Sequence, residues 1–240
     1  MEIDIQFLPF SPDPRALSNR SVVVIDVLRS TSVIVHAISQ GALEIIPSST
    51  VEEAFQTAAI YPSRTTLLGG ERESRKVPGF DLGNSPREYV AARVKGKRIV
   101  LTTTNGTKAF HLVSSGEEII AGSFFNLGAT VERCLEMDRD ILLFPSGDEG
   151  NFSLEDTVCG GMFIDLAARK RKGGLSLTDD SLAARILYQR FEANLSEALH
   201  LSRHGKDLVN SGAGDDLPYC AQVDLLPLVP IFREGVIRAK

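Results

Sequence analysis

The run Ser21-Val22-Val23-Val24-Ile25, which ends at Asp26, constrains the fold more than any other segment. β-branched residues in an unbroken apolar run favour a strand that is buried on both faces, as in the parallel sheets of α/β proteins. Such sheets bind their ligands beyond the carboxyl ends of the strands. Asp26 therefore stands where a sheet of this kind places a ligand.

A cation and three hydroxyl residues follow Asp26 before the chain turns apolar again at residues 33–35. Arg29, Ser30, Thr31 and Ser32 make up this group. The hydroxyls are candidate helix N-caps, and both a helix N-terminus and an arginine favour a bound anion. A carboxylate beside such a surface predicts a metal ion that bridges the protein and a phosphate.

Strand-like and helix-like segments alternate along the chain. We predict strands at residues 22–25, 43–46, 66–68, 98–101, 118–121 and 140–144. This alternation is typical of a layered α/β/α fold with a largely parallel mixed sheet. No linker interrupts residues 1–240, so we expect a single domain, and an arrangement in two lobes stays open.

Two helix starts are marked by their capping residues. Thr50 with Glu53 forms one capping box, and Ser85, followed by Pro86 and Glu88, forms another. A further helix is expected from Ser153 to a basic end before two glycines at 173 and 174. Residues 178–204 are expected to be helical, with an apolar face that packs in the core: Leu182, Ile186, Leu187 and Phe191.

Composition excludes several classes of function. The 240 residues carry a net charge of −5, which gives no general attraction to nucleic acid or anionic lipid. No apolar run is long enough to span a membrane and no signal peptide is present, so we expect a cytoplasmic protein with no membrane or nucleic-acid partner. The three cysteines form no CxxC pair, which argues against disulfides and a zinc site.

Polar residues follow several of the other predicted strands. Glu71 and Arg72 come after paired glycines in Leu67-Leu68-Gly69-Gly70-Glu71-Arg72, although this segment alone would suit a surface turn with an ion pair. The loop Thr102-Thr103-Thr104-Asn105-Gly106-Thr107-Lys108 offers hydroxyls and backbone amides that can cradle phosphate, without the spacing of a Walker loop.

The stretch from Pro145 to Asp156 holds four carboxylates: Asp148, Glu149, Glu155 and Asp156. Carboxylate oxygens at a loop–helix junction suit Mg²⁺. Each acid taken alone could simply complement the first turn of a helix.

Cys159 is predicted to be buried in the core and not to act as a nucleophile. His200 and His204 lack the HExxH pattern and are predicted to be surface residues and not zinc ligands.

Five blocks of sequence, in this order, resemble the 2-phosphosulfolactate phosphatase family: VVVIDVLRSTSVI, GGERES, GFDLGNSP, LTTTNGT and GNFSLEDTVCGG. The resemblance covers about residues 1 to 165. It implies a Mg²⁺-dependent phosphatase that converts (R)-2-phospho-3-sulfolactate to 3-sulfolactate and phosphate, in the route toward coenzyme M, on an α/β/α fold of the family's own type. Other 2-phospho-hydroxy acids stay open as substrates of this small anionic phosphoester class, and so does a homo-oligomer.

The residues and the resemblance together predict the site. The expected catalytic residues are Asp26, Arg29, Glu71 and Asn105. The expected Mg²⁺ ligands are Asp26, Glu71, Asp148, Glu155 and Asp156. Phosphate or the acidic arms of the substrate would be held by Arg29, Arg72, Thr103, Thr104, Gly106, Thr107 and Lys108. The attacking group is either a metal-activated water or Asp26 itself.

Two alternatives are weighed against this prediction. A haloacid-dehalogenase-type phosphatase also begins with an aspartate at the end of its first strand, but it needs a second aspartate where this chain has Leu28. A non-catalytic sensor of a phosphorylated or sulfonated metabolite would use the same loops. Phosphate release over many turnovers separates an enzyme from a sensor.

Overall fold

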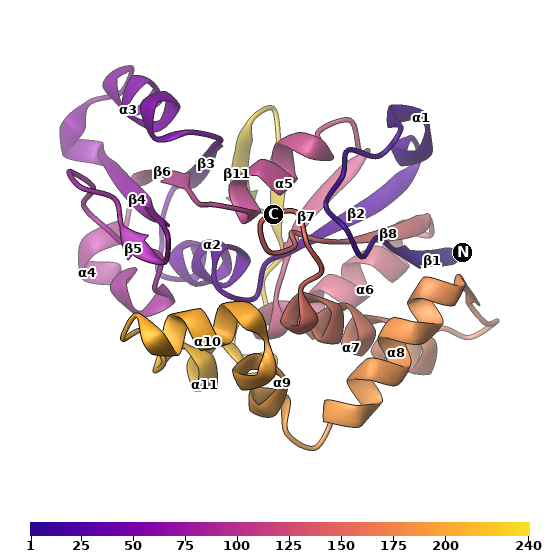
Figure 1. Cartoon of the computed structure of the whole chain (residues 1–240). Coiled ribbons are helices and arrows are strands. Elements are labelled where there is room, and N and C mark those ends of the chain that lie inside the picture. The colour runs from indigo at the N-terminus through magenta and orange to yellow at the C-terminus, as the bar shows by residue number, and fades with distance from the viewer.

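The computed structural model describes residues 1–240 and has a layered α/β fold built on one mixed sheet of eleven strands (Figure 1). In chain order the strands are β1 (Glu2–Ile5), β2 (Arg20–Ile25), β3 (Glu44–Ser48), β4 (Thr66–Arg72), β5 (Arg75–Lys76), β6 (Arg98–Thr102), β7 (Glu118–Gly122), β8 (Asp140–Pro145), β9 (Ser176–Leu177), β10 (Pro230–Arg233) and β11 (Val236–Ala239). All six predicted strands are confirmed, which supports the use of apolar β-branched runs as the strand signal.

Eleven α-helices and three short 3₁₀ helices connect the strands. The α-helices are α1 (Pro14–Leu17), α2 (Ser30–Ser39), α3 (Val51–Ala59), α4 (Ala91–Val94), α5 (Gly106–Leu112), α6 (Leu127–Met137), α7 (Leu154–Lys170), α8 (Asp179–Phe191), α9 (Leu195–Leu201), α10 (Arg203–Asn210) and α11 (Asp216–Cys220). The 3₁₀ helices are η1 (Ser63–Thr65), η2 (Pro86–Glu88) and η3 (Phe124–Asn126). None of these helices is long and apolar enough to cross a membrane.

The sheet consists of two parallel groups that a hairpin joins. The first group is β4, β6 and β3, and the second is β7, β2, β8, β1 and β9. Between them lies the hairpin β10–β11, which pairs antiparallel with β7 on one side and with β3 on the other. The two groups therefore run in opposite senses. The sheet as a whole is mixed and largely parallel, which confirms the predicted fold class.

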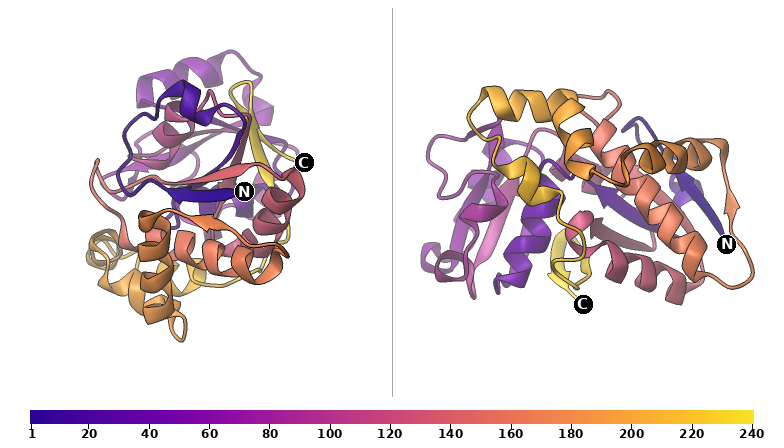
Figure 2. Two further views of the ribbon diagram at one scale, coloured as in Figure 1. Left: turned by 90° about the vertical axis from the view of Figure 1, so that its right-hand side faces the viewer. Right: turned by 90° about the horizontal axis from the view of Figure 1, so that it is seen from below.

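Alternate residues of β2 pack into different cores. Val22 and Val24 belong to an apolar cluster on one face of the sheet, and Val23 and Ile25 belong to a cluster on the other face. This strand is thus buried on both faces, as its β-branched sequence predicts. In the left-hand view of Figure 2 the helices of residues 154–210 lie below the sheet, while α3 lies above it.

Two of the three predicted helix starts are confirmed. Thr50 caps α3 by accepting a hydrogen bond from the backbone N–H of Glu53 at 3.1 Å, and Ser153 caps α7 by accepting one from Asp156. The prediction at Ser85 is wrong. Only the short helix η2 follows it, and its hydroxyl donates to Asp216 at 2.7 Å instead of capping.

The predicted core face of α8 is partly wrong. Phe191 is buried, but Leu182 and Ile186 are 48% and 58% exposed. Ser181, Ala184 and Tyr188 turn inward instead, because α8 lies so close to α7 that a Cβ on Gly161 would meet the backbone oxygen of Ala184 at 2.1 Å. Small residues permit this close packing, and a purely apolar pattern does not detect it.

Candidate active site

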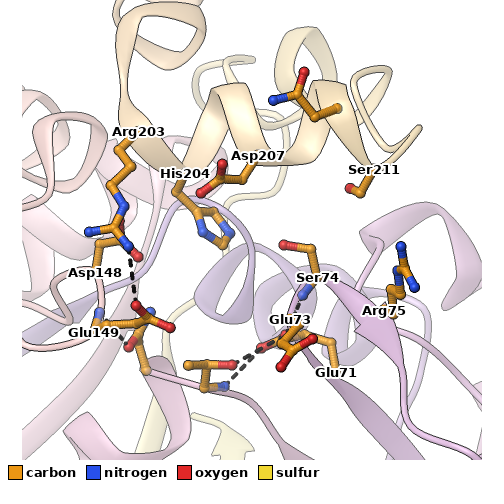
Figure 3. Close-up of a pocket in the computed structure, with 13 residues that line it drawn as sticks. Glu71, Glu73, Ser74, Arg75, Asp148, Glu149, Arg203, His204, Asp207 and Ser211 are labelled. Atoms are coloured by element: carbon orange, nitrogen blue, oxygen red, sulfur yellow. Dashed lines mark hydrogen bonds and ion pairs between the residues drawn. The ribbon is translucent and has the colours of Figure 1, made fainter.

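An open polar groove of about 420 Å³ lies where the two parallel groups meet. No apolar side chain lines it. Its wall comes from the β4–β5 hairpin, from the loops that follow β6 and β8, and from α10 (Figure 3). The lining residues are Glu71, Glu73, Ser74, Arg75, Thr104, Asn105, Asp148, Glu149, Arg203, His204, Asp207, Asn210 and Ser211.

The close approach of the two groups occurs beside Asp26. This residue follows β2, and its Oδ1 accepts a hydrogen bond from the backbone N–H of Ser30 at 3.2 Å. Gly106 begins α5, after β6, and a Cβ built on it would lie 2.3 Å from Oδ2 of Asp26 and 2.4 Å from Cβ of Ser30. Only glycine leaves room for the two loops at this contact.

A second contact joins the loops after β6 and β8. The backbone N–H of Glu149 donates to Oδ1 of Asn105 at 3.0 Å. Asn105 and Glu149 also line a second cavity of about 420 Å³, which Lys108 and Ser146 border. The predicted phosphate loop thus lies between two cavities, with Thr104 and Asn105 facing both.

Three buried carboxylates, Asp26, Glu155 and Asp156, form one electrostatic cluster beside the groove. Burial raises the pKa of Asp26, and the charge of Glu71 raises it further, while the imidazole of His204 opposes both effects. Burial likewise raises the pKa of Glu155, with a further contribution from Asp26. Burial raises the pKa of Asp156 well above its usual value, helped by Glu155 and Asp26. The charged forms of these acids are therefore costly unless a cation lies nearby.

Glu71 fixes the β4–β5 hairpin to the loop after β6. Its Oε1 accepts from the backbone N–H of Thr104 at 2.8 Å, and its Oε2 accepts from the backbone N–H of Ser74 at 3.0 Å. Glu71 also lines the groove. The structure therefore brings this predicted residue to the site.

Asp156 supports the loop after β2. Its Oδ1 accepts from the backbone N–H of Val27 at 2.8 Å, and the hydroxyl of Ser146 donates to its Oδ2 at 3.4 Å. Both oxygens are thus already engaged. Asp148 and Glu155 are less occupied: Asp148 lines the groove and lies 3.2 Å from Nε of Arg203, and Glu155 borders a smaller adjoining cavity with His204.

Arg29 lies outside the groove. Its guanidinium donates to Oδ2 of Asp216 at 2.7 Å, and the side chain is buried. The other oxygen of Asp216 accepts from Ser85 and from Nε of Arg87 at 3.0 Å. Arg29 therefore connects α11 to the start of α2, next to Asp26.

Of the remaining residues predicted to bind substrate, some line the groove and others only support it. Arg72 bonds to the backbone oxygens of Glu71 and Ser49 and to the hydroxyl of Thr102, and it does not line the groove. Thr103 and Thr107 are buried and bond to each other through backbone N–H and hydroxyl groups at 3.1 Å. These two threonines shape the loop that presents Thr104 and Asn105.

Sequence reasoning missed the contribution of α10. His204 and Asp207 of α10, with Ser211 at its C-cap, lie three and four positions apart on one helical face and cover the groove (Figure 3). His204 was expected at the surface, but it is half-buried and points toward the carboxylate cluster. The spacing of these polar residues indicates a shared helical face, but no local signal in the sequence places that face over the groove.

The carboxylate cluster suits a hard divalent cation by its chemistry. No three His, Cys, Asp or Glu side chains converge into a ready-made metal centre. The donors are nevertheless carboxylate oxygens, which Mg²⁺ and Ca²⁺ prefer, and burial and mutual repulsion disfavour their charge. A cation beside Asp26 and Glu155 would offset that cost.

Comparisons with known proteins identify a family model and several relatives that match nearly the whole chain. A family model described as 2-phosphosulpholactate phosphatase matches residues 9–235. A protein of Symbiobacterium thermophilum is 41% identical over 94% of this chain and 97% of its own length, and one of Thermotoga petrophila is 42% identical over 99% and 98%. A protein of Caldanaerobacter subterraneus subsp. tengcongensis is 40% identical over 95% and 94%. All three carry the name "Probable 2-phosphosulfolactate phosphatase".

Proposed function

The chain belongs to the 2-phosphosulpholactate phosphatase family, and on that premise we propose that it hydrolyses (R)-2-phospho-3-sulfolactate to 3-sulfolactate and phosphate. The observation that carries the proposal is the match to the family over residues 9–235, which includes every strand whose end contributes to the groove. An entirely polar groove suits a small substrate with several charged groups.

We further propose Mg²⁺ as the cofactor, held by Asp26 and Glu155 together with Asp148. When bound, it would neutralise phosphoryl oxygens and lower the pKa of a water molecule. Glu71 and Asp156 support the site indirectly, because both oxygens of each already accept hydrogen bonds from the protein.

Water is the proposed nucleophile. Asp26 is 5% exposed and does not line the groove, and its Oδ2 faces Gly106. A carboxylate that attacks phosphorus must reach the phosphoryl group in line with the leaving oxygen. Asp26 thus contributes charge at the base of the site, and water takes the nucleophilic role that remained open from the sequence.

Thr104, Asn105 and Lys108 are the proposed phosphate contacts. The first two face both cavities, and Lys108 borders the second cavity without any ion pair. Thr103, Thr107 and Gly106 act indirectly, since they set the conformation and close packing of the loop. Arg29 orients the start of α2 beside Asp26 through its pair with Asp216.

The test is phosphate release from (R)-2-phospho-3-sulfolactate, measured over many turnovers with Mg²⁺, after EDTA treatment and after Mg²⁺ is restored. Steady release that EDTA abolishes and Mg²⁺ restores is expected. Release limited to one equivalent would support a sensor. Undiminished turnover after EDTA treatment would remove Mg²⁺ from the proposal and leave the phosphatase activity.

A further inference from the structure

We propose that Arg75 is the specificity-determining residue that binds the sulfonate arm of the substrate. The inference rests on the proposed function and names the residue that distinguishes this substrate from a simple 2-phospho-hydroxy acid. Figure 3 shows Asp148 and Glu149 at one side of the groove and Arg75 at the other. Arg75 therefore lies across the groove from the pair that Arg203 neutralises, although Glu73 lies on its own side.

Of the two arginines that line the groove, only Arg75 has no ion pair within the protein. Arg203, the other groove arginine, pairs with Asp148 at 3.2 Å and with Glu149 at 3.1 Å. Arg75 makes no ion pair and no side-chain hydrogen bond, although Glu73 and Asp207 line the same groove. A guanidinium without a protein partner is available to an anionic ligand.

The position of Arg75 is fixed relative to the loop that is proposed to bind phosphate. It starts β5, directly after the turn that Glu73 and Ser74 form with left-handed backbones, at φ of 51° and 61°. Glu71 holds this turn through the N–H of Ser74 and holds the phosphate loop through the N–H of Thr104. One carboxylate therefore sets the spacing between the phosphate loop and Arg75.

The chemistry of a sulfonate fits this end of the groove. A sulfonate is a permanent anion with three oxygens in a tetrahedral arrangement, and arginine can donate two parallel hydrogen bonds to such a group. Ser74 and Ser211 lie near the same end and supply neutral donors (Figure 3).

The experiment compares two substrates and three variants. Wild type, Arg75→Ala, Arg75→Lys and Lys76→Ala are assayed with 2-phospho-3-sulfolactate and with 2-phospholactate, which lacks the sulfonate. Lys76 is the matched control, because it is the exposed neighbour on the same two-residue strand and does not line the groove. Inhibition by 3-sulfolactate and by lactate is measured alongside.

We expect Arg75→Ala to lower kcat/KM for the sulfonated substrate by about 10- to 100-fold, the range for a lost charged hydrogen bond, and to leave 2-phospholactate within about twofold. Arg75→Lys should show a smaller fall in kcat/KM for the sulfonated substrate, and Lys76→Ala should show none. The inhibition constant of 3-sulfolactate for Arg75→Ala should rise by a similar factor. This measurement tests the inference even if the enzyme does not turn over 2-phospholactate.

Two results would overturn the inference. Equal loss on both substrates, or no loss on either, would exclude Arg75 as the sulfonate residue while the wild-type activity keeps the proposed function intact. Wild-type protein that releases phosphate from neither compound would overturn the proposed function and the inference together.

Discussion

Asp26 combines a buried position with a charge that its surroundings disfavour. Replacing it in Asp26→Asn keeps the shape and the contact with Ser30 but deletes the charge at the base of the site. We expect kcat to fall by about 10²- to 10³-fold, the range for removing one group that stabilises transition-state charge. Steady-state kinetics with Mg²⁺ at saturation measure the effect.

The control for Asp26→Asn is Asp180→Asn, which removes an exposed carboxylate from the first turn of α8. Circular dichroism shows whether each variant is folded. Near-wild-type kcat in a folded Asp26→Asn would leave Asp26 as a structural residue at the end of β2.

Gly106 allows the two parallel groups to meet. In Gly106→Ala the new methyl group would lie 2.3 Å from Oδ2 of Asp26 and 2.4 Å from Cβ of Ser30, so the loops must separate. Overpacking of this kind costs about 1–3 kcal/mol of stability. We expect a lower Tm together with lower activity, measured by thermal melts and phosphate release.

Gly96→Ala serves as the comparison for Gly106→Ala, because Gly96 has a left-handed backbone (φ 71°) but no atom within 4 Å of a new Cβ. It should lose stability through backbone strain while kcat stays at the wild-type value. Full activity in Gly106→Ala would show that the close approach to Asp26 is not needed.

At the scale of elements, Glu44 joins three strands. This carboxylate on β3 accepts hydrogen bonds from Arg98 on β6 and from Arg238 on β11, the latter through Nε at 2.8 Å. Burial alone would raise the pKa of Glu44, but the two guanidinium groups outweigh burial and lower it below its usual value. Glu44 thus ties the hairpin to the first parallel group.

Glu44→Gln should reduce the free energy of unfolding by about 1.5–3 kcal/mol near neutral pH, the range for hydrogen bonds to charged groups. Because the folded pKa of Glu44 is lowered, its contribution is present above the unfolded pKa and is lost as pH falls through the folded value. Urea denaturation at several pH values should show wild type and variant converging in acid. A constant difference down to acid pH would contradict this account.

Apolar runs made most of the sheet predictable, and the hairpin was missed for a local reason. β10 and β11 are joined by Glu234 and Gly235, both with left-handed backbones at φ of 52° and 81°. Such a two-residue turn is usually signalled by Asn-Gly or Asp-Gly, and glutamate does not carry that signal. Each strand has only four residues, which is too short for an alternating pattern to be recognised in the sequence.

The site was predictable where it follows strands. Glu71, Thr104, Asn105 and Asp148 line the groove because strand ends converge there. His204 was not predictable, since α10 reaches the groove through packing against α9 and not through local sequence. The pairing of Arg29 with Asp216, 187 positions away, is equally invisible to spacing along the chain.

At the scale of the whole molecule, the buried carboxylates predict a link between pH, Mg²⁺ and stability. The raised pKa values of Asp26, Glu155 and Asp156 mean that the folded state keeps protons that the unfolded state has released. Metal-free protein should therefore lose stability as pH rises from the usual carboxyl pKa values of 3.8 and 4.5 toward the raised ones. Mg²⁺ should offset this loss, most strongly at higher pH.

Thermal melts near pH 5 and near pH 8, with EDTA or Mg²⁺, measure the link. Mg²⁺ at a hundredfold excess over its Kd adds about 2.7 kcal/mol, or roughly 5 °C or more in Tm for a chain of this size. Glu155→Gln should reduce the Mg²⁺ response. An equal Tm with EDTA and Mg²⁺ at both pH values would argue against a cation in this cluster.

The hairpin β10–β11 also has a consequence for biosynthesis. Every other strand precedes it in sequence, and yet it lies in the middle of the sheet, between β3 and β7. A growing chain can assemble each parallel group early, but nothing holds the groups together within one sheet until residue 239 has been made. Asp26 and Gly106 come from different groups, so we expect the contact between them to reach its final form only after the hairpin has been synthesised.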